Sequence, residues 1–598
     1  MKLSYEAPRF AQQQPDGSMR QEQEQQQSQA PPLPPVIQSL LLKAVRLQRA
    51  GRLSEAARIY RQILAFDAEQ ADSLHLLGMI AYQAGGYELA VAMIRKAIAI
   101  KVAMNDDQAS YHSNLGTVLQ AQGNLDEAAA CYERALTLEP ESAEVHLNLG
   151  NIFQAQDKLD EAVACYERAL ALRPELAEAH HSMGNVLQAM NLQAIDLQTI
   201  DLQTQNEDKL DEAVACYERA LALKPGYAQA HYNLGCALRS LGKVDEALVQ
   251  FRRALALQPD YAQAGFRESL TQLLKGDFAS GWRNYERRWL SYPKDHGTPM
   301  RTYRQPLWTG EKWTGEKLAD GRLLIWGEQG VGDEIMFAGL IPDVLRSGNR
   351  CILDCDARLK PLFVRSFPGI GVISGCVSQQ SSGRSSGQSS GESSGHDPEL
   401  DIAAHLPCGS LPGLFRATRA AFAATKSPYL VADPVERERF RARYSHADGR
   451  RLVGLAWHTN NRKTGRLRSI DLSLFAPLFG RRDIRWIGLQ YGDHDALQSQ
   501  VAAASAPIFI DRSVDQLSDI DVFAAQIAAM DMVVTIDNST AHLAGALGVS
   551  TMVLLPFAAD WRWLQTREDS PWYPSLRLFR QPRRGDWQSV MQRLTSAL

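Results

Sequence analysis

LDEAAACYERALTLEP, residues 125–140, decides the fold of the first half of the chain, because close copies follow at 159–174, 210–225 and 244–259. Its apolar residues recur every three or four positions, which places them on one face of a helix. A second helical segment containing a Leu-Gly or Met-Gly pair precedes each copy, and a proline ends each copy. Each unit is therefore predicted to be a pair of helices joined by a turn.

The units recur at a spacing of about 34 residues, which is the period of the tetratricopeptide repeat. The spacing is read from Gly116, Gly150, Gly184 and Gly235, and the last step is longer because it contains an insertion at 191–207. The period and the small-residue positions resemble this repeat, a helical hairpin that buries its apolar face by stacking on neighbours. Such a stack implies a superhelix whose concave surface binds a protein or peptide. An oligomerisation or spacing device is the alternative.

Changes in composition give the expected domain limits. Residues 1–35 are rich in Gln and Pro and are predicted to be disordered. The repeats with a helical cap are expected over 36–295, and the insertion at 191–207 is expected to form a surface loop. A Ser/Gly-rich tract at 379–397 is also expected to be loop.

Beyond residue 300, short β-rich runs alternate with helices, which predicts parallel sheets with crossover helices. A break in character near 434–449 separates an α/β domain at 300–440 from a second one at 448–598. Two such domains facing one another leave a cleft at the carboxyl ends of their strands.

The overall composition excludes several classes of protein. A net charge of -4 gives no reason to expect nucleic-acid binding. No apolar run approaches the ~18 to 20 residues of a membrane-spanning helix, and the first residues lack the order of a signal peptide, so a cytoplasmic location is expected. The cysteines form no CxxC pair, and Cys131, Cys165 and Cys216 share one repeat position, which predicts small buried thiols.

VVTIDNSTAHLAGALG, residues 533–548, predicts a buried strand followed by a capped helix. Asp537, Asn538, Ser539 and Thr540 stand where the helix begins, and His542 lies in its first turn. A helix N-terminus with extra hydroxyl donors suits a phosphate group. An ordinary capped turn with an incidental histidine is the alternative.

Two further loops of the same domain carry polar candidates. The run NNRKTGRLR, which follows another strand, contains Lys463 and Arg468, and at the carboxyl end of that strand it makes a candidate clamp for a diphosphate. The alternative is that this run is an ordinary solvated basic loop. Gln490, in the third loop, is predicted to reach the nucleotide.

The Gly-rich turn GEQGVGDEI, residues 327–335, follows a strand of the preceding domain. Its glycines do not have the spacing of a dinucleotide fingerprint, and the lysine of a P-loop is absent. Asp333 is placed at a helix start, where it either caps the helix or takes a proton from an attacking hydroxyl. Gln329 and three residues of the later aromatic loop, Asp560, Trp561 and Arg562, are candidates for an acceptor or sugar wall, although core packing also explains the aromatic cluster.

Four segments carry a family resemblance: GEQGVGDEIMFAGLIP, RSIDLSLFAPLF, DNSTAHLAGALGVSTMVLLPF and DWRWLQTREDSPWYPSLRLFRQ. They resemble the glycosyltransferase region of bacterial tetratricopeptide-repeat glycosyltransferases. That region is similar to the lipopolysaccharide heptosyltransferases and, more distantly, to protein O-GlcNAc transferases. The resemblance implies a GT-B fold of two Rossmann-like domains after an all-α superhelix, and an inverting transfer without metal or cofactor from a nucleotide-sugar donor.

The resemblance also implies roles for residues. Asp333 matches the catalytic base, and residues 537–542 match the turn that grips the donor. Lys463 or Arg468 stands at a basic donor contact. Asn538 and Ser539 depart from the usual Thr-Gly or Thr-Ser, and Tyr491 stands where a lysine is often found. A protein, a glycan or a lipid-linked saccharide remains open as acceptor, and a repeat scaffold with an inactive transferase domain remains the alternative function.

Overall fold

The computed structural model describes residues 34–194, 200–291, 301, 303, 305–308, 321–375, 401–425, 427–445, 449–459 and 465–598. Residues 1–33 of the predicted disordered tail and the Ser/Gly-rich tract lie outside these residues. The chain divides into two units, residues 1–179 and 180–598.

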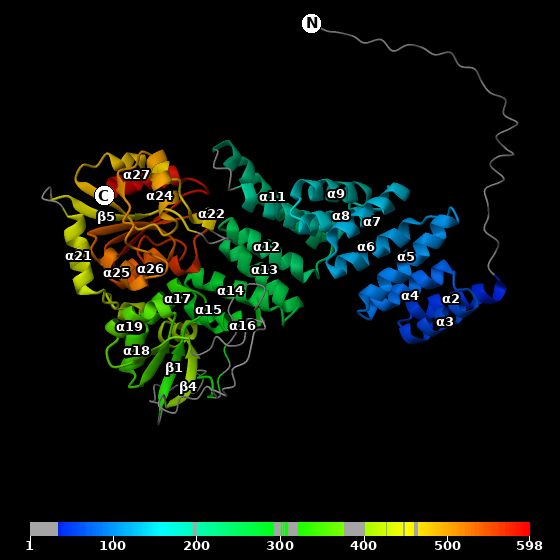
Figure 1. Cartoon of the computed structure of the whole chain (residues 1–598), viewed down its shortest axis with the longest axis horizontal. Coiled ribbons are helices and arrows are strands. Elements are labelled where there is room, and N and C mark those ends of the chain that lie inside the picture. The colour runs from blue at the N-terminus through cyan, green and yellow to red at the C-terminus, as the bar shows by residue number, and fades with distance from the viewer. Residues whose placement is uncertain are drawn as a thin grey trace, which may run out of the picture. The chain divides into compact units, whose positions relative to one another are not determined.

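The first unit is a row of helical hairpins, drawn from blue to cyan in Figure 1. Consecutive helices pack on each other, as the repeat period predicts. Apolar residues of neighbouring hairpins form its core. The helices are α2 (Pro35–Arg49), α3 (Leu53–Phe66), α4 (Ala71–Gln83), α5 (Tyr87–Ala103), α6 (Ala109–Gln122), α7 (Leu125–Leu138), α8 (Ala143–Ala155) and α9 (Leu159–Leu172), and α10 (Ala177–Ala194) begins at the end of this unit.

A glycine on the first helix of a repeat faces an aromatic ring on the second. A methyl group on Gly150 would lie 2.6 Å from Cε1 of Tyr166, and one on Gly184 would lie 2.7 Å from Cε1 of Tyr217. The insertion at 191–207 lies between Gly184 and Tyr217, whereas nothing is inserted between Gly150 and Tyr166. The inserted segment therefore leaves this close packing between the two helices intact.

The second unit begins with the remaining repeat helices. Here the sequence prediction of a loop at 191–207 is wrong for most of its residues, because 191–194 and 200–207 are helical. The inserted segment contains neither Gly nor Pro, so nothing in it ends a helix. The helices are α11 (Ile200–Leu223), α12 (Ala228–Ser240), α13 (Val244–Leu257), α14 (Ala262–Lys275), α15 (Phe278–Tyr285) and α16 (Arg288–Ser291).

The first sheet has four parallel strands in the order β3-β2-β1-β4. Strands β2 and β3 follow on one side of β1, and β4 pairs with the other side of β1, so the strand order reverses between β1 and β4. Its strands are β1 (Arg322–Trp326), β2 (Cys351–Asp354), β3 (Gly371–Ile373) and β4 (Ile402–Pro407). The helices are α17 (Val331–Ala338), α18 (Ile341–Arg346), η3 (Ala357–Leu359), α19 (Lys360–Ser366), η5 (Cys408–Ser410), α20 (Leu411–Phe415), η6 (Ala420–Ala424) and α21 (Pro434–Tyr444).

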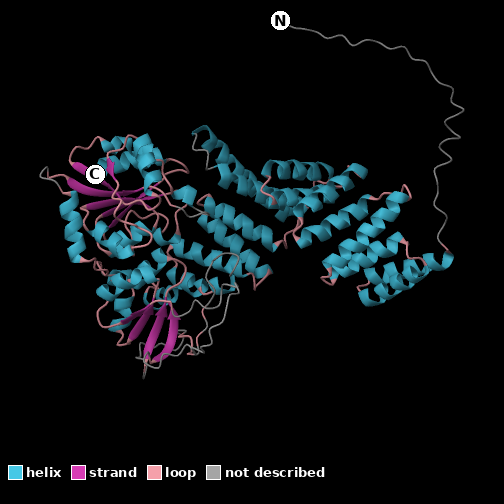
Figure 2. Ribbon diagram, in the orientation of Figure 1, coloured by secondary structure: helices cyan, strands magenta, loops and turns pink. Residues whose placement is uncertain are grey.

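The second sheet has six parallel strands in the order β10-β9-β8-β5-β6-β7, which is the doubly wound order with its reversal between β5 and β8. The two sheets are separate, as Figure 2 shows. The strands are β5 (Arg451–Ala456), β6 (Ile484–Gly488), β7 (Ile508–Phe509), β8 (Met532–Ile536), β9 (Thr551–Leu555) and β10 (Leu576–Arg580). The helices are α22 (Gly465–Arg468), η7 (Leu472–Phe475), α23 (Ala476–Phe479), α24 (His494–Ala503), α25 (Ile520–Ala528), α26 (Ser539–Ala546), η8 (Trp561–Trp563) and α27 (Trp587–Ala597).

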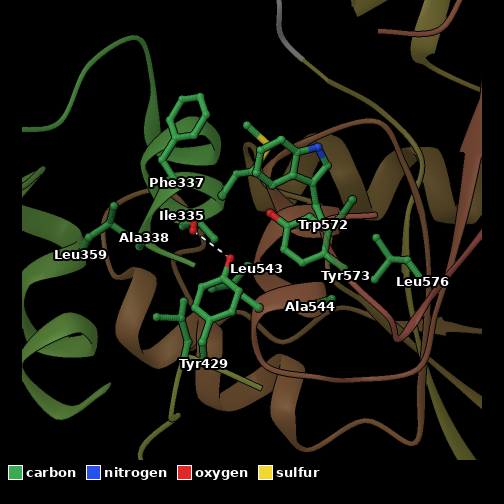
Figure 3. Packing of buried hydrophobic residues seen from close by; sticks show 14 of the residues in the cluster. Ile335, Phe337, Ala338, Leu359, Tyr429, Leu543, Ala544, Trp572, Tyr573 and Leu576 are labelled. Atoms are coloured by element: carbon green, nitrogen blue, oxygen red, sulfur yellow. Dashed lines mark hydrogen bonds between the residues drawn. The ribbon is translucent and has the colours of Figure 1, made fainter. Parts of the chain in front are cut away.

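One apolar core runs through the last repeat helices and both sheet domains. Figure 3 shows part of it, where Ile335 of α17 lies near Leu543 of α26. The Tyr429 hydroxyl donates to the Ile335 carbonyl oxygen over 2.8 Å. The predicted boundary near residue 295–300 thus does not coincide with the division at 179/180, because the last repeat helices share this core with the sheets. None of the described helices is long and apolar enough to span a membrane.

Candidate active site

The Gly-rich turn after β1 brings Asp333 to the first turn of α17. A Cβ at position 327 would lie 2.3 Å from the side-chain carboxyl carbon of Glu334, so any larger residue there would displace this carboxyl group. Gln329 adopts a positive φ of 70°, a conformation that is uncommon outside glycine. Its side-chain amide donates to the Tyr285 hydroxyl over 2.7 Å. The turn is therefore held in one conformation by its neighbours.

A buried ion pair between Arg288 and Glu328 holds the same turn in place. Nε and Nη2 of Arg288 donate to the two oxygens of Glu328 over 2.9 and 2.8 Å. Glu328 also accepts the backbone N–H of Gly409 over 2.9 Å. Gly409 follows β4, so the pair joins the ends of β1 and β4 at the reversal of the strand order. The sequence analysis missed both residues, since neither belongs to a recognisable motif.

Asp333 begins a chain of alternating charges that crosses to the second sheet domain. Nε of Arg562 donates to Oδ1 of Asp333 over 3.0 Å, and Nη1 donates to Asp560 over 2.6 Å. Arg468 contacts Asp560 at 3.8 Å and Asp537 at 3.2 Å. The structure thus brings together five of the residues that the sequence analysis proposed.

The surroundings shift the pKa values of these carboxyl groups in different directions. Burial raises the pKa of Asp333 above its ordinary value, although Arg562 opposes the shift. Burial also raises the pKa of Asp537, against the nearby Arg468. For Asp560 the desolvation is outweighed by Arg562 and Arg468, which lower its pKa to about 2. Asp333 is consequently the better proton acceptor and Asp560 the permanent anion.

The N-terminus of α26 follows β8, at the reversal point of the second sheet. Oδ1 of Asn538 accepts the backbone N–H of Ala541 over 3.3 Å, so this side chain caps its own helix. The Nδ2 atom of Asn538 and the hydroxyl of Thr540 are buried and have no hydrogen-bond partner among the described residues. Ser539, the first residue of the helix, is partly exposed. The cap occupies one amide and leaves these other donors for a ligand.

His542 lies on α26 and faces α17. Its Nδ1 shares a hydrogen bond of 2.9 Å with the Tyr573 hydroxyl, and its ring stacks on Trp563 at 5.3 Å. Burial, helped by Arg562, lowers the pKa of His542 to about 3, so the ring is neutral. A Cβ on Gly332 would lie 3.2 Å from His542 Cδ2 and 3.8 Å from Ser539 Cα. The residue before Asp333 therefore touches the first turn of α26.

The Gln490 side chain binds neighbouring backbone groups instead of making the predicted nucleotide contact. Its oxygen accepts the backbone N–H groups of Trp457 and His458 over 2.9 and 2.8 Å. Its nitrogen donates to the carbonyls of His458 and Tyr491, both over 3.0 Å. Both donors and both acceptor positions of the amide are used, so none remains for a ligand. The prediction for Lys463 lies outside the described residues.

Trp561 is buried in an aromatic cluster and does not line an open surface. Its ring lies edge-on to Trp282 of α15 at 5.3 Å and near Tyr285 at 6.0 Å. The guanidinium of Arg562 lies 4.5 Å from the centre of the Trp561 ring. Core packing, the alternative considered from the sequence, accounts for this residue, while Asp560 and Arg562 stay partly exposed beside it.

The short Asp-X-Asp sequences at 354–356 and 519–521, which imitate a metal motif, have other partners. Asp354 accepts from Arg301 over 2.9 Å, and Asp356 caps the helix η3. Asp519 caps α25, and Asp521 binds Arg365 through both oxygens. These carboxylates serve helix starts and ion pairs. No cluster of three or more metal-ligating side chains occurs among the described residues.

Comparison with known proteins identifies the repeats. Residues 69–141, 106–175 and 228–261 match models described as tetratricopeptide repeat, and residues 207–238 match one described as TPR repeat. The helical repeats are tetratricopeptide repeats. The matched residues cover less than half of the chain and stop before the first sheet.

Curated relatives extend the comparison. The chain is 27% identical over 398 residues to Protein FlbA of Caulobacter vibrioides, and the match spans 64% of each chain. It is 37% identical over 92 residues to human tetratricopeptide repeat protein 7B, which spans 15% of this chain and 10% of that protein. The chain thus spans less than two thirds of either relative. The FlbA match spans 64% of the chain, which is more than all the residues that precede β1 at Arg322, so it includes part of the sheet-bearing region.

Solved structures of repeat proteins are also similar to part of the chain. YrrB, described as a TPR protein with an unusual peptide-binding site, is 23% identical, covers 35% of this chain and 96% of its own, and has a TM-score of 0.27. Pseudomonas aeruginosa pilF is 20% identical and covers 38% of this chain and 94% of its own, with a TM-score of 0.32.

Proposed function

We propose that the chain is a glycosyltransferase of the GT-B kind, which moves a sugar from a nucleotide-sugar donor to a hydroxyl acceptor. The acceptor oxygen attacks the anomeric carbon while the bond from that carbon to the diphosphate oxygen breaks. The hydroxyl proton passes to Asp333, and the electron pair of the broken bond leaves with the nucleoside diphosphate. A single displacement of this type inverts the anomeric configuration and uses no metal ion.

The observation that carries the proposal is the contact of Gly332 with the first turn of α26. It puts a carboxylate of raised pKa within one residue of a helix N-terminus that retains unpartnered donors among the described residues. Each group follows a strand at the reversal of its own sheet, where α/β proteins commonly bind ligands. Base and anion site therefore belong to different domains, and an in-line displacement requires them to act on opposite faces of the sugar bound between them.

The charges beside Asp333 suit the departing diphosphate. Arg468 and Arg562 stand among Asp333, Asp537 and Asp560, and their side chains are 22% and 14% exposed. Guanidinium groups and a helix N-terminus stabilise a developing negative charge when they are already oriented. The neutral ring of His542 adds a polar group without a charge that would compete for the carboxylate.

The tetratricopeptide repeats are proposed to recruit the acceptor or a partner protein. Their last helices share a core with both sheet domains, so a protein bound there is held on the same unit as Asp333. A protein acceptor is favoured by the repeats, and a glycan or lipid-linked saccharide is the other candidate.

A second function is a repeat scaffold whose transferase-like domains are inactive. Two observations favour it: Asn538 occupies one amide of its own helix, and Arg562 already binds Asp333. Incubation with a panel of nucleotide sugars separates the two functions. A transferase releases nucleoside diphosphate, slowly by hydrolysis and faster with acceptor, and Asp333→Asn stops the release. No release from any donor by the wild-type protein would support the scaffold.

A further inference from the structure

The last repeat helices meet the second sheet domain beside the charged chain of the candidate active site. A Cβ on Gly242, in the turn between α12 and α13, would lie 3.0 Å from the ring of Phe557. Helix α14 packs against η8, the helix that carries Arg562. Trp561 of η8 lies against Trp282 and Tyr285 of α15. These contacts bring the last repeat helices to the edge of the site.

Arg239, in the last turn of α12, is a basic residue that this packing brings near Asp560. Its side chain is partly buried, and it makes no ion pair or hydrogen bond with any residue in the described part of the chain. Burial lowers its pKa, the neighbouring Arg267 lowers it further, and Asp560 opposes them. An arginine in this position is destabilised by desolvation and like-charge repulsion, and no ion pair offsets these costs within the described residues.

The charges around Asp560 lead to the same conclusion about Arg239. Three arginines act on this carboxylate: Arg562, Arg468 and Arg239. Arg562 and Arg468 already form ion pairs with carboxylates of the site. Arg239 forms none with a residue that the structure describes, although Asp560 attracts it, so no carboxylate holds its guanidinium by direct contact on the repeat side of the site. A partly buried guanidinium in this state suits an anionic ligand group.

We propose that Arg239 binds the diphosphate of the nucleotide donor, so that a tetratricopeptide repeat helix supplies part of the donor site. This inference rests on the proposed function and specifies it. The repeat array then does more than recruit an acceptor. Its last units complete the anion site that the second sheet domain forms with Arg468 and the α26 N-terminus, and the repeats cannot be separated from the sheets without loss of donor affinity.

The experiment measures binding of inorganic pyrophosphate, UDP, GDP, CDP and ADP to the full chain by calorimetry. Arg239→Gln is expected to weaken the best of these ligands by about tenfold or more, the usual cost of a charge-assisted hydrogen bond. Arg239→Lys is expected to retain an intermediate affinity, because it keeps the charge. The matched control is Arg253→Gln, an exposed arginine on the neighbouring helix α13, which is expected to bind like the wild type. Circular dichroism shows whether each variant is folded.

The outcomes separate this inference from the proposed function. Equal affinity of Arg239→Gln and wild type overturns the inference, whether or not sugar is transferred. Absence of binding of every probe to the wild-type protein overturns it too. Weakened binding in Arg239→Gln, together with failure of the wild-type protein to release nucleotide from any sugar donor, supports the anion site and contradicts the transferase. If Arg239→Gln misfolds, Arg239→Lys decides between the outcomes. An affinity below that of the wild type, with binding that weakens as salt is added, supports the site. An affinity equal to that of the wild type at every salt concentration overturns the inference.

Discussion

Asp333 of the first sheet domain accepts a hydrogen bond from Nε of Arg562 of the second over 3.0 Å, and Nη2 of Arg562 contacts the same oxygen. Both contacts use Oδ1. The other oxygen, Oδ2, makes no hydrogen bond with a residue of the described part of the chain. The carboxylate is thus oriented from one side and retains one oxygen for the proton of an acceptor hydroxyl.

Asp333→Asn is expected to reduce sugar transfer by about 10²- to 10⁴-fold, the usual contribution of a general base. The amide oxygen can still accept from Arg562, so donor affinity is expected to stay within a few fold of the wild type. Release of nucleotide measures the first quantity and calorimetry with a nucleoside diphosphate the second. Asp401→Asn, at an exposed acid of the same domain, is the control. Loss of donor binding in Asp333→Asn would make Asp333 a structural residue.

Gly150→Ala is expected to destabilise the first unit. The added methyl group would lie 2.6 Å from Cε1 of Tyr166, inside a packed helix pair. Overpacking of this kind costs about 1–3 kcal/mol, reduced here by the helix propensity of Ala, which is better than that of Gly by about 1 kcal/mol. Thermal unfolding followed by circular dichroism measures the change. Gly226→Ala, where a Cβ meets nothing within 4 Å, is expected to leave the melting temperature nearly unchanged. Equal melting temperatures of the two variants would contradict the packing argument.

The sequence was sufficient for the repeats, because a hairpin that must stack on its neighbours repeats its apolar positions and its small residues at a fixed period. The strands were also visible, as runs of β-branched residues ended by polar turns. The position of Asp333 followed from one such end, since a residue after a parallel strand falls at the edge where ligands bind. The prediction of a surface loop at 191–207 was wrong for most of its residues, because inserted sequence is expected to form a loop, but this segment lacks helix breakers.

Sequence could not decide which polar side chains were already occupied. Gln490 follows a strand, as a ligand residue does, but four backbone groups use its amide completely. Trp561 stands in a polar loop, but α15 covers it. Arg239 belongs to a repeat helix and comes near Asp560, which lies in the last strand-rich part of the chain, only through tertiary packing. Such relationships depend on long-range contacts that no local pattern encodes.

Glu328→Ala is expected to lower the free energy of unfolding by about 3 kcal/mol, because it removes the buried carboxylate that pairs with Arg288 and leaves only the more exposed Glu286. Turnover is expected to fall as well, since Glu328 holds the turn that carries Gln329 and Asp333. Urea unfolding followed by tryptophan fluorescence measures the stability. The double variant Arg288→Met/Glu328→Leu, which removes both charges, is expected to recover part of the loss.

An exposed ion pair serves as the control for the buried pair of Arg288 and Glu328. Arg95 and Glu127 form an ion pair whose side chains are 55% and 57% exposed. Glu127→Ala is expected to change the free energy of unfolding by less than about 1 kcal/mol. If Glu328→Ala were as mild as Glu127→Ala, the buried pair would have no part in fixing the turn.

The stability of the second unit is expected to fall at acid pH through His542. Its pKa is about 3 in the folded chain, because the ring is buried, and near 6.5 when exposed. Below pH 6.5 the unfolded chain therefore binds a proton that the folded chain excludes, and stability is lost as the pH falls from 6.5 towards 3. Between pH 6.5 and 4.5 this single group removes about 2–3 kcal/mol.

His542→Gln isolates that contribution, because glutamine does not titrate. The variant is expected to be less stable than the wild type at pH 7, where it loses the ring contacts with Trp563 and Tyr573. The gap is expected to shrink as the pH falls, since the wild type alone loses the contribution of His542. Urea midpoints at several pH values, read from tryptophan emission, measure the gap. His146→Gln, at a surface histidine of the repeats, is expected to follow the wild type. A gap that stays constant from pH 7 to 4.5 would show that His542 is accessible to protons in the folded chain, and its neutral role beside Asp333 would then be wrong.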